Sequence, residues 1–173
     1  MFKKILVVCI GNICRSPTAE VLLREALARS DIEVSSAGLA ALDDNPIEPT
    51  ARMVLEEHGY VPTAHKASQL TSESVCGSDI ILVMEQGHIK GVLNIAPEAR
   101  GKVFLLGKWQ DNREIRDPYR QGKPAFVHAY TLIEEAVQAW AQRLRTLSVI
   151  HHIVIRADKL TYATVNRSEC AGL

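Results

Sequence analysis

An unbroken run of apolar, largely β-branched residues close to the N-terminus, Lys4-Ile-Leu-Val-Val-Cys9, constrains the fold more than any other segment. Such a run is typical of a strand that is buried on both faces. Gly11 and Asn12 interrupt it, and Ser16-Pro17 then resembles an N-cap followed by proline at the first helical position. Apolar residues behind this point fall on one helix face: Ala19, Leu22, Leu23, Ala26 and Leu27. The segment predicts a strand, a short loop and a helix.

The same alternation continues along the chain. We expect further strands at 33–37, 79–84 and 102–106, and helices at 50–58 and after Pro124. The last helix has an apolar stripe that we interpret as core: Phe126, Tyr130, Ile133, Val137, Trp140 and Leu144. Strands that alternate with helices imply an α/β fold whose parallel sheet is covered on both faces. Residues 149–155 have strand character, and they fit an appended edge strand, a partner-binding tail or a poorly ordered segment.

Composition excludes several classes of protein. The 173 residues suffice for one domain with a real core, and 20 basic residues balance 20 acidic ones. We therefore expect no binding of nucleic acid and no membrane insertion. Four cysteines are too few for a secreted disulfide framework, so we interpret them as reduced cytoplasmic thiols: Cys9, Cys14, Cys76 and Cys170. The six histidines are scattered and predict no metal site.

The loop between the first strand and helix carries the chemistry. Five residues separate Cys9 from Arg15, and a helix begins directly afterwards. Such a loop can turn successive backbone N–H groups inward as an anion nest, with Gly11 supplying conformational freedom. Arg15 can bind two phosphate oxygens at once, and the positive surroundings favour the reactive thiolate of Cys9. Ser16 can donate a hydrogen bond to the sulfur, and Asn12 can hold the loop's shape.

An acid for the leaving group is expected in the long charged segment 107–124. Cleavage of an aryl phosphate ester requires a proton donor, and Asp117, followed by Pro118, is the candidate. A basic group surrounds it: Arg113, Arg116, Arg120 and Lys123. These residues either attract an acidic, phosphorylated substrate segment or are solvated loop charges.

The Cys9–Ser16 loop together with Asp117-Pro118-Tyr119 resembles the signature of the low-molecular-weight protein tyrosine phosphatase family. Further similar segments are Ser35–Leu39, Gly59–Thr71, Met84-Glu85 and Arg100–Val103. The similarity covers about residues 1–147, and is greatest to the bacterial branch associated with capsule and exopolysaccharide synthesis. It implies a single domain over 1–147 with a four-stranded parallel twisted sheet and helices on both faces. Residues 148–173 would form a C-terminal extension.

The resemblance also implies roles for individual residues. Cys9 would be the nucleophile that forms a phosphocysteine, Arg15 the phosphate clamp, and Asp117 the acid and then the base. Residues implied to contact the substrate or to build its cradle are Ile10, Gly11, Asn12, Ile13, Cys14, Ser16, Leu39 and Tyr119. Ser36 and His65 would support the loop. Cys14 either forms a reversible disulfide with Cys9 or packs against the first helix.

The expected activity is hydrolysis of protein phosphotyrosine without a cofactor or metal. By resemblance the partner is a phosphotyrosine-bearing protein, a bacterial tyrosine kinase that controls capsule or exopolysaccharide production, and the enzyme is a monomer or self-associates weakly. Two departures from the family pattern are Ser68 where arginine usually precedes Gln69, and Arg120 where eukaryotic members often carry tyrosine.

Rival functions fit the residues less well. Arsenate reduction needs further resolving cysteines, and phosphoarginine hydrolysis goes with threonine where this chain has Ile13. A non-catalytic phosphotyrosine-binding module would have lost a catalytic group, and none is lost. A phosphocysteine sugar-transfer protein would not place Arg15 and an acid where they speed hydrolysis.

Overall fold

The computed structural model describes residues 2–28, 31–62 and 64–169, and the side chains through Thr146. Phe2–Ala141 form one compact unit, and the chain from Gln142 onward belongs to a second. The fold and the site below are those of the first unit.

Four parallel strands form the sheet: β1 (Lys4–Cys9), β2 (Glu33–Gly38), β3 (Ile80–Val83) and β4 (Val103–Leu105). Their order is β2-β1-β3-β4, and the register places Cys9 opposite Gly38. Val7 and Val8 on the central strand are fully buried, as a strand covered on both faces requires. The prediction of a four-stranded parallel α/β sheet is confirmed, with no strand end shifted by more than one residue.

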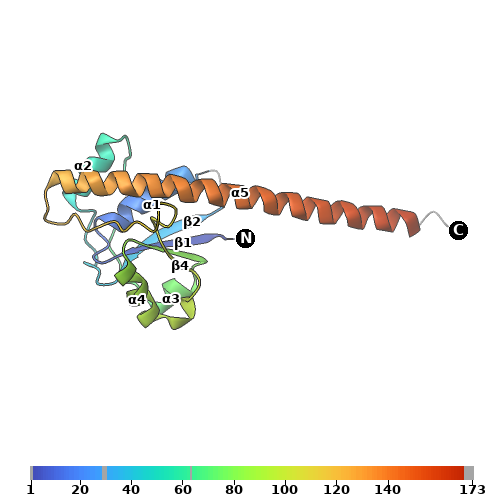
Figure 1. Ribbon diagram of the computed structural model, residues 1–173, viewed down its shortest axis with the longest axis horizontal. Coiled ribbons are helices and arrows are strands. Elements are labelled where there is room, and N and C mark those ends of the chain that lie inside the picture. Colours follow the sequence, from blue (N-terminus) through green and yellow to red (C-terminus); the bar gives the residue numbers. More distant parts are fainter. Residues whose placement is uncertain (1, 29–30, 63, 170–173) are drawn as a thin grey trace. The chain divides into compact units, whose positions relative to one another are not determined.

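Helices cover both faces of this sheet. One face carries α1 (Arg15–Ala26), α2 (Pro49–Glu57) and the first part of α5, and the other carries α3 (Ser72–Cys76), α4 (Gln86–Ile95) and the 3₁₀ turn η1 (Pro97–Ala99) (Figure 1). The sequence patterns did not predict α3 and α4. A capping box between Thr71 and Ser74 starts α3, whereas α4 begins without a side-chain cap.

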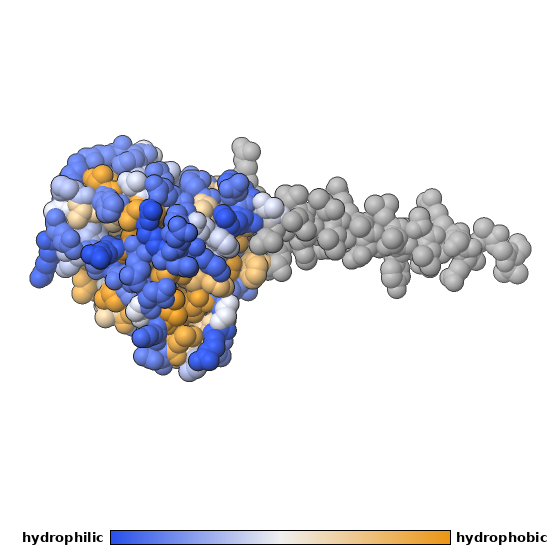
Figure 2. All heavy atoms as spheres, viewed as in Figure 1, coloured by the Kyte–Doolittle hydropathy of each residue, from blue (hydrophilic) through white to orange (hydrophobic). Residues whose placement is uncertain are grey.

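The aromatic stripe of α5 lies in the core, as predicted. Phe126, Tyr130, Ile133, Val137 and Trp140 are all buried. The indole Nε1 of Trp140 donates to the carbonyl of Leu106 at 2.8 Å, which ties α5 to the end of β4. Hydrophilic residues cover much of the face of this unit seen in Figure 2, and apolar residues emerge between them in patches.

Helix α5 (Lys123–Glu169) includes residues 149–155, where the sequence has strand character. Of the alternatives for this segment, an appended edge strand is wrong. β-Branched residues disfavour a helix only slightly, and extending an existing helix avoids the cost of nucleation. Cys170 lies outside the described residues. Over the part of the chain described here, no helix combines the length and apolarity needed to cross a membrane.

Candidate active site

The site lies at the carboxyl end of β1, where the chain continues to β2 on one side and returns to β3 on the other. Ligands of open α/β sheets bind at such a switch point. The loop from Ile10 to Cys14 leads directly into α1, which begins at Arg15. Ser16 is therefore inside the first turn and is not the N-cap that the sequence predicts, so its hydroxyl is available to the loop.

Cys9 is 3% exposed at the bottom of this loop. Its Sγ lies 2.9 Å from Ser16 Oγ and accepts from the backbone N–H of Asn12 at 3.3 Å. Because Asn12 Nδ2 already donates to Ser16 Oγ at 2.9 Å, the hydroxyl proton of Ser16 remains for the sulfur. The Cys9 sulfur thus meets two hydrogen-bond donors close to the N-terminal end of α1.

Asn12 holds the loop together. It has a positive φ of 55°, so Asn12 is the residue of this loop that adopts the left-handed conformation. Gly11, which the sequence predicts to supply the loop's conformational freedom, does not have a positive φ. Its Nδ2 also donates to Ser36 Oγ at 2.9 Å, and its Oδ1 accepts from the backbone N–H of Ser68 at 2.9 Å. His65 Nε2 contacts the Asn12 carbonyl at 2.7 Å. These bonds offset the cost of the left-handed conformation.

The segment that departs from the family pattern still supports the site. Ser68 contacts Asn12 through its backbone, and Gln69 donates to the carbonyl of Leu39 at 2.9 Å. The backbone contact of Ser68 does not depend on an arginine side chain there. Behind the loop, Glu20 accepts a hydrogen bond from Ser36, a contact that sequence reasoning missed.

Arg15 is 2% exposed and is held by three groups. Its Nη2 donates to Asp117 Oδ2 at 2.7 Å and its Nη1 to the carbonyl of Ile115 at 2.9 Å, while Glu85 pairs with Nη1. The Nε atom is buried without a hydrogen-bond partner in the described residues. The Nε–H therefore remains a donor for an oxyanion, and it lies in the plane of the guanidinium beside Nη2, in the geometry that phosphate prefers.

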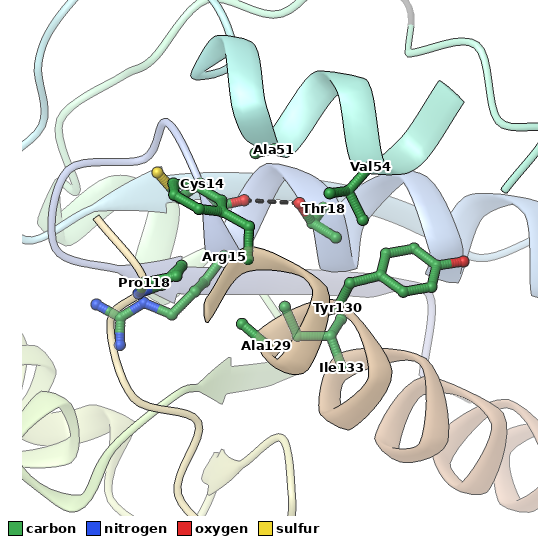
Figure 3. A pocket seen from close by; sticks show the side chains of 10 residues that line it. Cys14, Arg15, Thr18, Ala51, Val54, Pro118, Ala129, Tyr130 and Ile133 are labelled. Carbon is green, nitrogen blue, oxygen red and sulfur yellow. Dashed lines mark hydrogen bonds between the residues drawn. The ribbon is translucent and has the colours of Figure 1, made fainter. Parts of the chain in front are cut away.

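The stem of Arg15 lies among apolar residues of α2 and α5. Figure 3 shows Ala51 and Val54 on one side and Ala129 and Ile133 on the other, around a cavity of only about 10 Å³. A void of this size holds at most about one water molecule. The packing therefore fixes the aliphatic stem of Arg15.

Asp117 is held by hydrogen bonds to its side chain and to its main chain. Its Oδ1 accepts from the backbone N–H of Tyr119 at 3.1 Å, and Gln121 donates to its carbonyl at 2.6 Å. The long loop thereby brings Asp117 to Arg15, 102 residues earlier in the chain.

A cavity of about 180 Å³ opens above Cys9. Its lining residues are Cys9, Ile10, Gly11, Ile13, Cys14, Arg15, Ala40, Leu42, Asp117 and Tyr119. Leu39, expected beside the substrate, is not among them: a Cβ on Gly91 would lie 2.8 Å from its Cδ1, so Leu39 fills the space that Gly91 leaves. Leu42 and Ala40, which sequence reasoning missed, line the cavity instead.

Two buried groups border the site. Burial, followed by the charges of Asp117 and Cys9, raises the pKa of the Cys14 thiol, so this thiol stays neutral. His88 is 5% exposed, with Nε2 at 3.7 Å from Glu85 Oε1. Burial, and then the charge of Arg15, lowers the pKa of His88. Glu85 and His88 follow the carboxyl end of β3, and this position after a parallel strand could have predicted them as residues of the site.

The described residues contain no group of three or more His, Cys, Asp or Glu side chains placed to hold a metal ion. The chemistry available at the site is that of a thiol nucleophile, an oxyanion clamp and a carboxyl group.

Comparison with known proteins agrees with this geometry. The profile of the family described as "Low molecular weight phosphotyrosine protein phosphatase" matches residues 4–148. The chain belongs to this family. This low-molecular-weight phosphatase is 48% identical over 143 residues to the low molecular weight protein-tyrosine-phosphatase Etp of Escherichia coli K12, covering 83% of this chain and 95% of Etp. It is 46% identical over 149 residues to Wzb of the same organism, covering 86% of this chain and all of Wzb.

Solved structures of the family share the fold. Vibrio vulnificus Wzb in complex with benzylphosphonate is 50% identical, with a TM-score of 0.79, over 83% of this phosphatase and 99% of that chain. The YwlE arginine phosphatase from Geobacillus stearothermophilus is 33% identical, with a TM-score of 0.80, over 87% and 97% of the two chains. The family expected from the sequence is confirmed.

Proposed function

We propose that this phosphatase hydrolyses phosphotyrosine in proteins through a phosphate ester on Cys9. The observation that carries the proposal is a nearly buried sulfur, 2.9 Å from Ser16 Oγ, in a cavity whose walls include Arg15 and Asp117. Nucleophile, oxyanion clamp and proton donor thus share one space.

In the first step the Cys9 thiolate attacks phosphorus. A sulfur–phosphorus bond forms and the bond from phosphorus to the tyrosine oxygen breaks, while protonated Asp117 gives its proton to that oxygen. The loop N–H groups and Arg15 stabilise the charge on the equatorial oxygens. Tyrosine leaves as a neutral phenol.

Phosphate entry changes the partner of Arg15. Nη2 donates to Asp117 in this structure, and a phosphate oxygen would compete for it. The exchange would release Asp117 towards the leaving group, while Ile115 and Glu85 keep Nη1 in place.

In the second step Asp117 acts as a base. Its carboxylate takes a proton from water, the water oxygen attacks phosphorus, and the phosphorus–sulfur bond breaks to release inorganic phosphate. The bonds from Ser16 and from the Asn12 N–H stabilise the departing thiolate.

The shape of the cavity supports an aryl phosphate as substrate. Cys9 is 3% exposed, whereas the rim residues Ile10, Leu42 and Tyr119 are 40%, 44% and 41% exposed. An aromatic ring can pass between these apolar side chains while its phosphate reaches Cys9. The shorter side chain of phosphoserine would leave its phosphate farther from the sulfur.

We further propose that the partner is a bacterial tyrosine kinase controlling capsule or exopolysaccharide production, and that the enzyme acts in the cytoplasm without a cofactor. The similarity to Wzb and Etp supports the partner. Cys9, Cys14 and Cys76 are free thiols, which supports a reducing compartment.

The test is phosphate release from matched phosphotyrosine, phosphoserine and phosphoarginine peptides by wild type, Cys9→Ser and Cys76→Ser. We expect wild type and the Cys76→Ser control to hydrolyse the phosphotyrosine peptide, and Cys9→Ser to be inactive. Rapid quenching should trap phosphate on Cys9. Release from the phosphoarginine peptide alone would point instead to an arginine phosphatase, the activity for which YwlE is named. No phosphate release from any peptide by reduced wild type would refute the proposed function.

A further inference from the structure

A second cavity, of about 380 Å³, lies beside the loop that carries Asp117. We call it the acid-loop cavity. Its walls come from the 113–121 loop and from α5, and include Arg113, Arg116, Pro118, His128, Ala129 and Leu132. Asp117 lines both this cavity and the cavity above Cys9, so the two cavities lie on either side of Asp117.

Two arginines and two carboxylates line the acid-loop cavity, and they differ in their partners. Glu114 accepts from the backbone N–H of Gln86 at 2.7 Å, and Asp117 is bound to Arg15. Arg113 lies 3.5 Å from Glu135. Arg116, by contrast, is exposed and has no ion pair or hydrogen bond among the described residues.

Exposed His128 adds a second polar group to the rim. The floor of the cavity is apolar, because Pro118 and Ala129 are buried and Leu132 is half-buried. An apolar floor with the unpaired guanidinium of Arg116 at its rim suits a side chain that has an apolar stem and an anionic end. Phosphotyrosine, glutamate and aspartate side chains have this character.

We propose that the acid-loop cavity is an accessory subsite for an anionic side chain of the same substrate segment, located near the phosphotyrosine that is being hydrolysed. The proposal rests on the proposed function, because it places the reacting phosphotyrosine above Cys9. An extended peptide advances about 3.3 Å per residue, so a side chain two to four residues away lies roughly 7–13 Å along the chain. The enzyme would then prefer phosphotyrosine flanked by acidic or phosphorylated residues.

The experiment compares three phosphotyrosine peptides that differ only in flanking residues. One has neutral flanks, one has glutamates within four residues on either side, and one has a non-hydrolysable phosphonomethyl-phenylalanine at those places. Each is assayed for kcat and KM with wild type, Arg116→Gln and His128→Gln. Arg100→Gln is the matched control, because Arg100 is also exposed but follows η1 on the other face of the sheet.

We expect wild type and Arg100→Gln to show a KM roughly 3–10-fold lower for an anionic flank, since Arg116 can form a charge-assisted hydrogen bond with the anion. Arg116→Gln should lose most of this preference through KM, and His128→Gln part of it. A lower KM for the phosphonate peptide alone would identify a second phosphotyrosine as the occupant. An equally low KM for the glutamate peptide would show that a carboxylate suffices.

Equal KM values for all three peptides with wild type would overturn the subsite while leaving the proposed function intact. The same holds if Arg116→Gln keeps the full preference. Failure to hydrolyse any of the peptides would refute the proposed function instead.

Discussion

Asp117 Oδ2 accepts a hydrogen bond of 2.7 Å from Nη2 of Arg15, so the proposed acid and the proposed phosphate clamp bind each other in the structure. The carboxylate occupies a donor that the incoming phosphate also needs. Binding and proton donation are therefore coupled through one guanidinium nitrogen.

This pair predicts opposite effects of Asp117→Ala on turnover and on phosphate binding. We expect kcat for phosphotyrosine to fall about 10²–10⁴-fold, because the leaving oxygen loses its proton donor. The inhibition constant of inorganic phosphate should stay equal or fall, because Nη2 is freed. Steady-state kinetics with phosphate as competitive inhibitor measures both. Phosphate binding that weakened in step with kcat would contradict the exchange of partners.

Asn12 predicts a difference between two substitutions at one position. Both Asn12→Gly and Asn12→Ala lose the bonds to Ser16, Ser36 and Ser68, at a cost of about 1–3 kcal/mol in the free energy of unfolding. Alanine should cost roughly 1–2 kcal/mol more, since φ is 55° there. Urea unfolding measures the difference. Equal stabilities would show that the loop relaxes from the left-handed conformation.

Leu42 and Leu39 predict separable effects on substrate binding and on stability. Leu42→Ala should raise KM for a phosphotyrosine peptide several-fold with little change in unfolding, because Leu42 is 44% exposed at the rim. Leu39→Ala should lower the free energy of unfolding by about 1–3 kcal/mol, because Leu39 packs against Gly91 and the core. Kinetics and urea unfolding on both variants provide the test. The reverse pattern would restore Leu39 to the substrate site.

Cys14 should resist alkylation in the folded enzyme. Its raised pKa keeps the thiol protonated near neutral pH, and thiolates are the reactive form. Iodoacetamide followed by peptide mass mapping should label Cys9 and the exposed Cys76 long before Cys14, and inorganic phosphate should protect Cys9 alone. Labelling of Cys14 at the rate of Cys76 would show that the thiol is neither buried nor protonated.

The elements that local patterns predict are those with a continuous signal. The apolar run of β1 and the apolar stripe of α5 predict a strand and a helix without any information about the elements that pack against them. Helix α4 was missed because Gly87 and Gly91 interrupt its pattern and no side chain caps its start. It forms because the crossover from β3 to β4 packs it against the sheet, and Gly91 makes room for Leu39.

The candidate site divides in the same way. Cys9, Arg15 and Ser16 belong to one short loop, so their meeting follows from the sequence. The contacts of Arg15 with Glu85 and Ile115 join residues 70 and 100 positions apart, and depend on how the strands line up. Leu39 and Leu42 illustrate a further limit, because which of two nearby leucines reaches a cavity depends on backbone direction after β2.

His88 predicts a loss of stability in acid that one substitution should remove. Its pKa is lowered in the folded protein, chiefly by burial and then by Arg15, against the opposing charges of Glu85, Asp117 and Glu114. Below about pH 6.5 the unfolded chain binds a proton at this position that the folded state resists, so the free energy of unfolding falls as pH drops through this range. At about pH 7.5 and above, His88 is neutral in both states and the effect vanishes.

Urea unfolding at pH 7.5 and pH 5.5 therefore should show a smaller loss for His88→Gln than for wild type. Gln keeps an amide that can donate to Glu85, and it carries no titrating group. His128→Gln is the control for the replacement of a histidine by glutamine, because His128 is exposed on α5. A wild-type loss that persisted in His88→Gln would assign the acid sensitivity to another group and show that charging His88 costs the fold little.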